Sequence, residues 1–167
     1  MSPINGDDER ALGDFYAESY ARLVGVVGAI VGDRQEAEEA VQDAFVRLLG
    51  QWPKVAHYDD PEAWVRKVAL GFASNRRRKL RNGLRAVSRL GATPHGAAPS
   101  GDAVDLRRAL SALPQPQRAV IVLQDLGLGV QDIANQLGIP VGTVKSRLAR
   151  ARNALAPLLR EDSNDHV

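Results

Sequence analysis

Apolar residues recur at spacings of three and four along most of the chain, which places them on one face of an α-helix. The first such stripe spans residues 8–31 and stops at Gly32, and a second follows Asp33. Because Glu36 lies three residues after Asp33, the aspartate can cap the second helix by accepting a free backbone N–H. No segment alternates clearly between apolar and polar residues, so the pattern predicts an all-α protein. The expected core positions are Leu12, Phe15, Tyr16, Leu23, Val26, Val27 and Ile30 in the first helix, and Ala37, Val41, Ala44, Phe45 and Leu48 in the second.

A third helix is expected after a turn-rich stretch at residues 50–61. Asp59 or Asp60 serves as its cap, and Pro61 lies in its first turn, where a missing backbone N–H costs little. A run of basic residues forms its last turns and ends before Gly83. The expected buried stripe of this helix consists of Trp64, Val68 and Phe72.

The composition changes at residues 86–104, which are rich in Pro, Gly, Ala and Ser and show no periodicity. Such a segment predicts a flexible linker. We therefore expect two small helical domains, at residues 8–85 and 105–160. Short helices are expected in the second domain at residues 105–113 and 116–126.

Residues 129–155 have the pattern of a helix-turn-helix, with Gly138 free to take a positive φ at the turn and Pro140 starting the second helix. Ile133, Ala134 and Leu137 form the apolar face of the first helix, and Ile139 fills the junction. The buried stripe of the second helix is Val144, Leu148, Ala151 and Leu155. Because the pattern is typical of DNA binding, we favour that function over a plain helical bundle with solvated basic residues. The positions left to face a major groove are Gly142, Thr143, Lys145, Ser146, Arg147 and Arg150.

Charge is strongly segregated along the chain, although the formal net charge is only +2. Residues 1–62 hold thirteen acidic and five basic side chains, whereas residues 64–101 hold nine basic ones and no acid. Five of the six residues from 76 to 81 are basic. A helix C-terminus stabilises a nearby cation by about 0.3–1 kcal/mol, which does not account for so dense a cluster. The asymmetry indicates two different partners, one for the acidic surface and a polyanion for the basic one.

The sequence gives little support for a metal site, a catalytic site, a membrane span or an export signal. The chain has no cysteine, and His57, His95 and His166 lack metal-ligand spacing. Tyr58, Asp59 and Asp60 come nearest to a nuclease site, but one of these aspartates already serves as a helix cap. No apolar run is long enough to span a membrane, and the N-terminus does not resemble an export signal. We expect a cytoplasmic protein without catalytic residues, bound metal or cofactor.

Two ordered motifs carry a family resemblance, which covers about residues 15–159. The sequence LPQPQRAVIVLQDLGLGVQDIANQLGIPVGTVKSRLARAR resembles region 4 of bacterial RNA polymerase sigma factors of the extracytoplasmic-function group. The sequences GDRQEAEEAVQDAFVRLL and DPEAWVRKVALGFASNRRRKLR resemble region 2 of the same group. The chain departs from the family pattern at Gly71, where many members have Asn, at Asn75, where many have Asp, and at Gly129, where Ser or Thr is usual.

The resemblance implies a transcription initiation factor that takes core RNA polymerase to promoter DNA under the control of an anti-sigma factor. Its polymerase partners are the clamp coiled coil of the largest subunit and the flap region. Contact with the clamp is implied for Glu39, Gln42, Asp43 and Val46. Contact with the melted -10 element is implied for the turn at residues 52–60, with Trp52, His57 and Tyr58 as candidates to hold a flipped base. Backbone phosphates there are assigned to Arg76, Arg77, Arg78 and Lys79, with Arg81 beside them. The groove-facing residues of the helix-turn-helix, numbered above, are assigned to the -35 element.

Some positions have a simpler interpretation. Core packing is the favoured role for both Trp52 and Trp64, although Trp52 is also a candidate for base contact, and His57 and Tyr58 fit half-buried turn residues as well as base contacts. The competing function is a stand-alone helix-turn-helix regulator with an N-terminal sensing domain. That protein binds its operator tightly by itself, whereas a sigma factor needs the polymerase for specificity.

Overall fold

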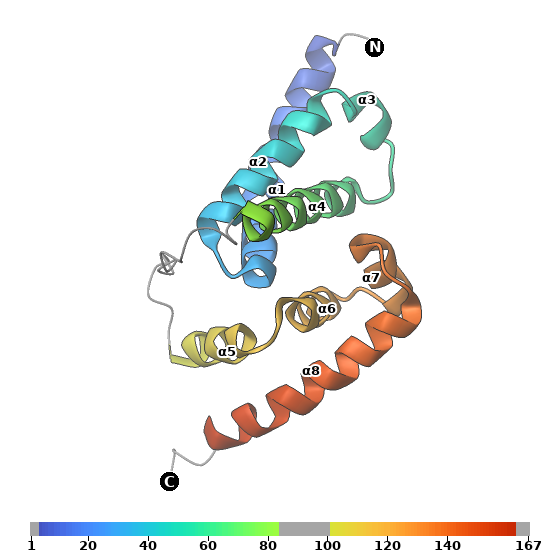
Figure 1. Cartoon of the computed structure of the whole chain (residues 1–167). Helices are drawn as coiled ribbons and strands as arrows, with labels where there is room; N and C mark the ends of the chain where they lie inside the picture. Colours follow the sequence, from blue (N-terminus) through green and yellow to red (C-terminus); the bar gives the residue numbers. More distant parts are fainter. Residues whose placement is uncertain (1–3, 84–100, 163–167) are drawn as a thin grey trace. The chain divides into compact units, whose positions relative to one another are not determined.

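Helices form all the regular secondary structure in residues 4–83 and 101–162, the parts of the chain that this computed structural model describes (Figure 1). The chain divides into two units, residues 1–94 and 95–167. The predicted all-α fold with two helical domains is therefore confirmed. None of the described helices is long and apolar enough to cross a membrane. The first unit contains α1 (Gly6–Val31), α2 (Arg34–Leu49), α3 (Trp52–Val55) and α4 (Pro61–Gly83).

The ends of α1 and α2 are defined by local hydrogen bonds. The Asn5 side chain accepts the Asp8 N–H at 2.8 Å, and α1 ends where Gly32 adopts φ 83°. Asp33 then accepts the Glu36 N–H at 3.0 Å and caps α2. These observations confirm the predicted glycine stop and aspartate cap. Both could be predicted from the sequence because each depends only on residues that are neighbours in sequence.

The core of the first unit lies where α2 packs against both α1 and α4 (Figure 1). All five apolar positions expected for α2 are buried. On α1, Leu12, Leu23, Val27 and Ile30 are buried, whereas Phe15 and Val26 are half-buried. Tyr16 was expected in the core but is 42% exposed. Tyr16 packs against Phe45 of α2 and also lines an open hollow between α1 and α2.

The prediction for α4 was correct in position but wrong in the face that is buried. Asp60 is the cap, accepting the Ala63 N–H at 3.0 Å, and the helix runs to Gly83 as the basic run indicated. Trp64, Val68 and Phe72 are only half-buried. Helix α4 packs against both α2 and α1, and these two contacts together decide which of its faces is buried. Its buried residues are Val65, Arg66, Ala69, Leu70 and Ala73.

The turn-rich stretch contains one element that the sequence pattern did not indicate. Residues Trp52–Val55 form α3, a single helical turn with Pro53 near its start. The Ala56 N–H continues it by donating to the Trp52 carbonyl at 2.9 Å. The loop expected from Trp52 to Asp60 is therefore a helical turn followed by a shorter loop.

The second unit contains α5 (Gly101–Ala112), α6 (Gln115–Asp125), α7 (Val130–Leu137) and α8 (Val141–Asp162). The long helix α8 contacts each of the other three. Helix α5 begins at Gly101, so residues 101–104 were wrongly assigned to the linker, because a few Gly and Ala residues obscured a helix start. The rest of the expected linker, residues 86–100, lies outside the described residues.

Helices α7 and α8 form the helix-turn-helix that the pattern predicted. Gly138 adopts φ 64° and donates its N–H to the Ala134 carbonyl. The Pro140 carbonyl then accepts the Thr143 and Val144 N–H groups at 3.0 and 3.1 Å, so α8 begins directly after the proline. The expected interior positions are buried at Ile133, Ala134, Val144, Leu148 and Ala151, and half-buried at Leu137, Ile139 and Leu155.

Candidate functional site

The face of α2 opposite the core presents the four residues predicted to contact a protein partner. Glu39, Gln42, Asp43 and Val46 are all exposed, and we call them the α2 face. Val46 is 66% exposed, a large fraction for an aliphatic side chain among charged neighbours. Their spacing of three and four residues is what places them together on one side of a helix.

An open hollow of about 560 Å³ adjoins the α2 face. It lies between α1 and α2, and its walls are mostly apolar, including Leu12, Tyr16, Phe45, Val46 and Leu49. The hydrophobic pattern did not predict the hollow, because Tyr16 fitted a core position and Leu49 fell outside the expected stripe. The adjacent leucines at positions 48 and 49 could have indicated an exposed apolar residue here, since only one of them can face the core.

Packed aromatic rings support the hollow. The Tyr16 ring lies 4.8 Å from the Phe45 ring in an edge-on arrangement and 5.0 Å from the Tyr20 ring, centroid to centroid. The Tyr20 hydroxyl accepts a hydrogen bond from the Gln42 side chain at 3.2 Å. These contacts tie the α2 face to α1.

The three candidates for base contact differ in exposure. Trp52 is only 5% exposed, and its ring lies 5.4 Å from that of Phe15, centroid to centroid. Its indole N–H has no hydrogen-bond partner among the described residues. The indole therefore packs in the core, as the favoured interpretation of Trp52 had it, and offers no open stacking surface in this conformation. His57 and Tyr58 are exposed rather than half-buried, and their backbone N–H groups donate to the carbonyls of Lys54 and Val55.

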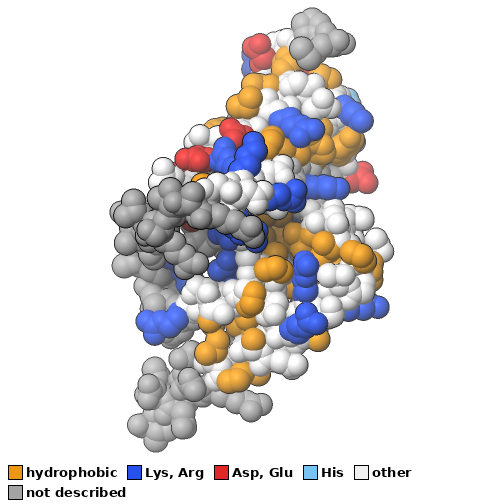
Figure 2. Space-filling model, in the orientation of Figure 1, with side chains coloured by type: hydrophobic (Ala, Val, Ile, Leu, Met, Phe, Trp, Pro, Cys, Tyr) orange, Lys and Arg blue, Asp and Glu red, His pale blue; other side chains and the backbone are white. Residues whose placement is uncertain are grey.

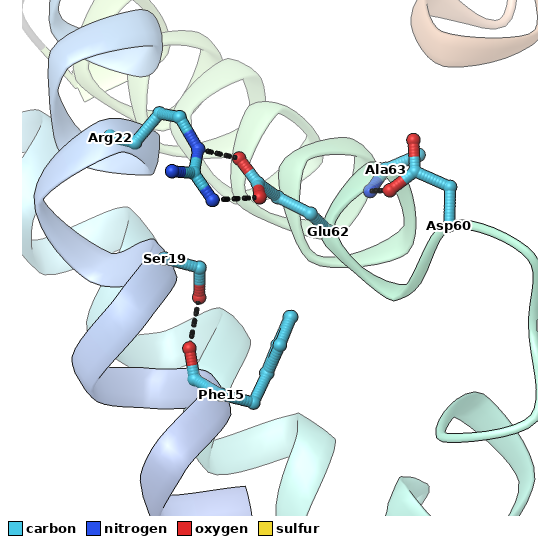
Figure 3. A network of polar contacts seen from close by, with 6 residues as sticks. All are labelled: Phe15, Ser19, Arg22, Asp60, Glu62 and Ala63. Atoms are coloured by element: carbon cyan, nitrogen blue, oxygen red, sulfur yellow. Dashed lines mark hydrogen bonds and ion pairs between the residues drawn. The ribbon is translucent and has the colours of Figure 1, made fainter.

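A bidentate ion pair holds the start of α4 against α1 (Figure 3). Arg22 donates from Nε and Nη2 to the two carboxylate oxygens of Glu62, at 2.8 and 2.6 Å. These hydrogen bonds and the charge of Glu62 raise the pKa of Arg22 above its ordinary value. Glu62 lies in the first turn of α4, so the pair joins α1 to the start of the helix that follows the turn with His57 and Tyr58.

The basic run at the end of α4 divides into two kinds of residue. Arg76 bonds to Glu39 at 3.0 Å and also to Asp43, and Arg77 bonds to the Val31 carbonyl and lies 3.6 Å from Glu36. Figure 2 shows acidic side chains directly beside basic ones on this unit. The remaining three, Arg78, Lys79 and Arg81, are exposed and have no side-chain partner within residues 4–83 and 101–162.

The first turns of α8 carry the residues assigned to a DNA groove. Gly142, Lys145, Ser146 and Arg150 are exposed, and Thr143 and Arg147 are half-buried. The Ser146 hydroxyl donates to the Thr143 carbonyl at 3.1 Å. A Cβ added at Gly142 would meet no atom within 4 Å, so no packing inside the protein requires a glycine there.

Comparison with known proteins identifies both units. Residues 15–83 match the family described as Sigma-70 region 2, and residues 103–155 match Sigma-70, region 4. The ECF RNA polymerase sigma factor SigC of Mycobacterium tuberculosis is 31% identical over 135 residues, covering 76% of this chain and 72% of that protein. SigW of Bacillus subtilis, another ECF RNA polymerase sigma factor, is 28% identical over 178 residues, covering 96% of this chain and 95% of that protein.

A solved structure that is similar to this chain is also that of a sigma factor. The sigma factor RpoE from Bartonella quintana, in complex with the anti-sigma factor NepR, has a TM-score of 0.70 and 27% identity, covering 88% of this chain and 97% of that one. The two family regions also occur here in order, on the two helical units described above. This chain therefore belongs to the extracytoplasmic-function group of the sigma-70 family of RNA polymerase sigma factors, which are transcription initiation factors and not enzymes.

Proposed function

We propose that this protein binds core RNA polymerase in the cytoplasm and directs it to promoters by recognising a -10 element with its first unit and a -35 element with its second. The observation that carries the proposal is the match of both units, in order, to regions 2 and 4 of one family. Each unit also presents exposed residues of the chemistry that its proposed partner requires.

Docking on the polymerase is assigned to the α2 face. Its exposed carboxylates, Glu39 and Asp43, suit a basic protein surface such as the clamp coiled coil of the largest subunit. Val46 and the adjoining hollow supply apolar area, which gives most of the free energy of a protein interface. The flap region is the proposed polymerase contact of the second unit.

Recognition of the -10 element is assigned to the turn before α4 and to the end of α4. With Trp52 packed on Phe15, the exposed His57 and Tyr58 are the side chains available to enclose a displaced base. Stacking on such a side chain is worth about 1–3 kcal/mol per base. Arg78, Lys79 and Arg81 lie exposed at the other end of the same helix and suit backbone phosphates.

Recognition of the -35 element is assigned to the start of α8. Lys145 and Arg150 are exposed and can reach base edges or phosphates, and Arg147 is half-buried. Gly142 leaves room for a phosphate close to the backbone at the helix N-terminus, where free N–H groups favour an anion.

Regulation by an anti-sigma factor belongs to the same proposal. It is supported by the solved relative, which was captured with its anti-sigma factor NepR. Such a partner would cover surfaces that the polymerase or the promoter otherwise uses, among them the apolar hollow beside the α2 face.

Run-off transcription with purified core polymerase and genomic templates tests the proposal. We expect defined transcripts only when the protein is added, and fewer with Asp43→Arg, because charge reversal repels a basic docking partner. Asp14→Arg is the matched control, an equal charge change at an exposed position of α1 outside the α2 face. The stand-alone regulator is supported instead if no template yields a transcript and the protein alone protects a palindrome.

A further inference from the structure

Arg76 connects two surfaces that the proposed function treats as separate. Its guanidinium bonds to Glu39 at 3.0 Å and to Asp43, the two carboxylates of the α2 face. Arg76 itself belongs to the basic run at the end of α4. Thus one cation of the basic run, next to the residues proposed to bind phosphate, is neutralised by the two anions of the proposed polymerase surface.

The neighbouring arginine has a different environment. Arg77 bonds to a backbone carbonyl, that of Val31, and lies near Glu36, which is outside the α2 face. Arg78, Lys79 and Arg81 are already exposed. Within the basic run as far as the structure describes it, Arg76 is the member that bonds to the proposed polymerase-binding carboxylates.

The ion pairs of Arg76 are accessible enough to be exchanged. The side chain of Arg76 is 33% exposed, and those of Glu39 and Asp43 are 53% and 48% exposed. Exposed ion pairs add little net stability, because water and salt compete with them. A cationic group of a partner can therefore take over the carboxylates without unfolding the helix pair.

From these contacts we infer that Arg76 couples polymerase docking to DNA binding, an inference that rests on the proposed function. In the free protein, Glu39 and Asp43 hold Arg76 away from phosphate. When the polymerase occupies the carboxylates, Arg76 is released and adds one phosphate contact at the -10 strand. By linkage, the same competition makes Arg76 weaken polymerase binding, so each partner favours the other.

The first test uses the free protein and a duplex DNA of random sequence, so it needs no polymerase. Glu39→Gln/Asp43→Asn removes both negative charges with little change of shape. We expect DNA affinity to rise about three- to tenfold, in the range of two exposed ion pairs. The slope of log affinity against log salt steepens by about one, because one more phosphate is contacted.

The control separates this effect from the removal of negative charge as such. Asp14→Asn/Glu18→Gln removes the same charge from exposed positions of α1 outside both surfaces. It raises affinity less and leaves the salt slope unchanged, because the number of phosphates bound is the same. Adding Arg76→Gln to the Glu39→Gln/Asp43→Asn variant abolishes the extra gain. An equal gain and slope in the two double variants, or a gain that survives Arg76→Gln, overturns the coupling.

The second test measures the reciprocal effect on core polymerase. Arg76→Gln frees the two carboxylates, so we expect binding to core polymerase to tighten about three- to tenfold. Unchanged or weaker binding overturns the coupling. A separate measurement shows whether the proposed function itself fails. If Asp43→Arg does not change binding to core polymerase, the α2 face is not the docking site. The DNA-binding measurements with the Glu39→Gln/Asp43→Asn variant, with and without Arg76→Gln, do not depend on that assay.

Discussion

Two glycines at the helix-turn-helix show how neighbouring residues of one type serve different purposes. Gly138 has φ 64°, a backbone conformation that L side chains rarely adopt, and it allows α7 to end and α8 to turn back. Gly142 lies in the first turn of α8 without a positive φ, and a Cβ there would meet no atom within 4 Å. The fold thus requires a glycine at position 138 and tolerates alanine at position 142.

Alanine substitutions separate these two requirements. We expect Gly138→Ala to destabilise the second unit by about 1–2 kcal/mol, because alanine is strained at positive φ. Gly142→Ala stabilises it, by at most about 1 kcal/mol, because alanine is the better helix former. Amide hydrogen exchange in α7 and α8 of the full chain measures both. If Gly142→Ala nonetheless lowers transcription from -35-dependent promoters, the close phosphate contact proposed there is supported.

Among the helices, α4 carries different functions at its two ends. Its start is held by the Asp60 cap and the Arg22–Glu62 pair, directly after the turn with His57 and Tyr58. Its end carries the basic run. A rigid helix of 23 residues keeps these two parts of the proposed -10 site in one fixed arrangement.

The two adjacent aspartates before α4 provide a matched pair for testing its cap. Asp60→Ala removes the acceptor of the Ala63 N–H and should destabilise the first unit by about 1 kcal/mol. Asp59→Ala makes the same charge change at the exposed position before the cap, and we expect less than about 0.5 kcal/mol. Urea unfolding followed by tryptophan fluorescence reports on this unit, because Trp52 and Trp64 both belong to it. Equal effects of the two substitutions would assign the destabilisation to charge rather than to the cap.

Across the whole molecule, the acidic and basic segments of the chain do not form fully separate surfaces. Within the first unit they pair with each other, through Arg76 with Glu39 and Asp43 and through Arg77 with Glu36. In residues 76–81, Arg76 and Arg77 therefore have acidic partners within the protein. Arg78, Lys79 and Arg81 are the ones that we expect to hold phosphates in the initiation complex from the outset.

Replacing Arg78, Lys79 and Arg81 together with Gln should reduce open-complex formation without changing which promoters are chosen, because phosphate contacts carry no base information. The salt slope of promoter binding by the holoenzyme should fall by about 0.7–0.9 for each phosphate that is no longer bound. Replacing Arg10, Arg107 and Arg108, which are exposed and outside the candidate site, is the control that removes equal charge. Filter binding at several salt concentrations and mapping of transcript starts measure the two effects. A changed promoter preference would contradict this assignment.

Much of the fold followed from short-range rules. The cap at Asp33, the stop at Gly32 and the turn at Gly138 depend on residues within four positions of one another, so the sequence alone indicates them. The α2 face was likewise predictable from helical spacing. The buried face of α4 was not, because the sequence pattern of a single helix does not say that two other helices will pack against it.

The amino-acid sequence was enough to establish the helical class, the helix-turn-helix, the α2 face and the family. The packing of the helices was needed to establish which members of the basic run are already paired, since Arg76 lies 37 and 33 residues from its partners Glu39 and Asp43. It was also needed to show that Trp52 packs on Phe15 whereas His57 and Tyr58 remain exposed. The physical reason is the sequence separation of the interacting residues. Hydrogen bonds and side-chain spacing within a helix depend on neighbouring residues, whereas an ion pair between helices forms only when segments distant in sequence pack together.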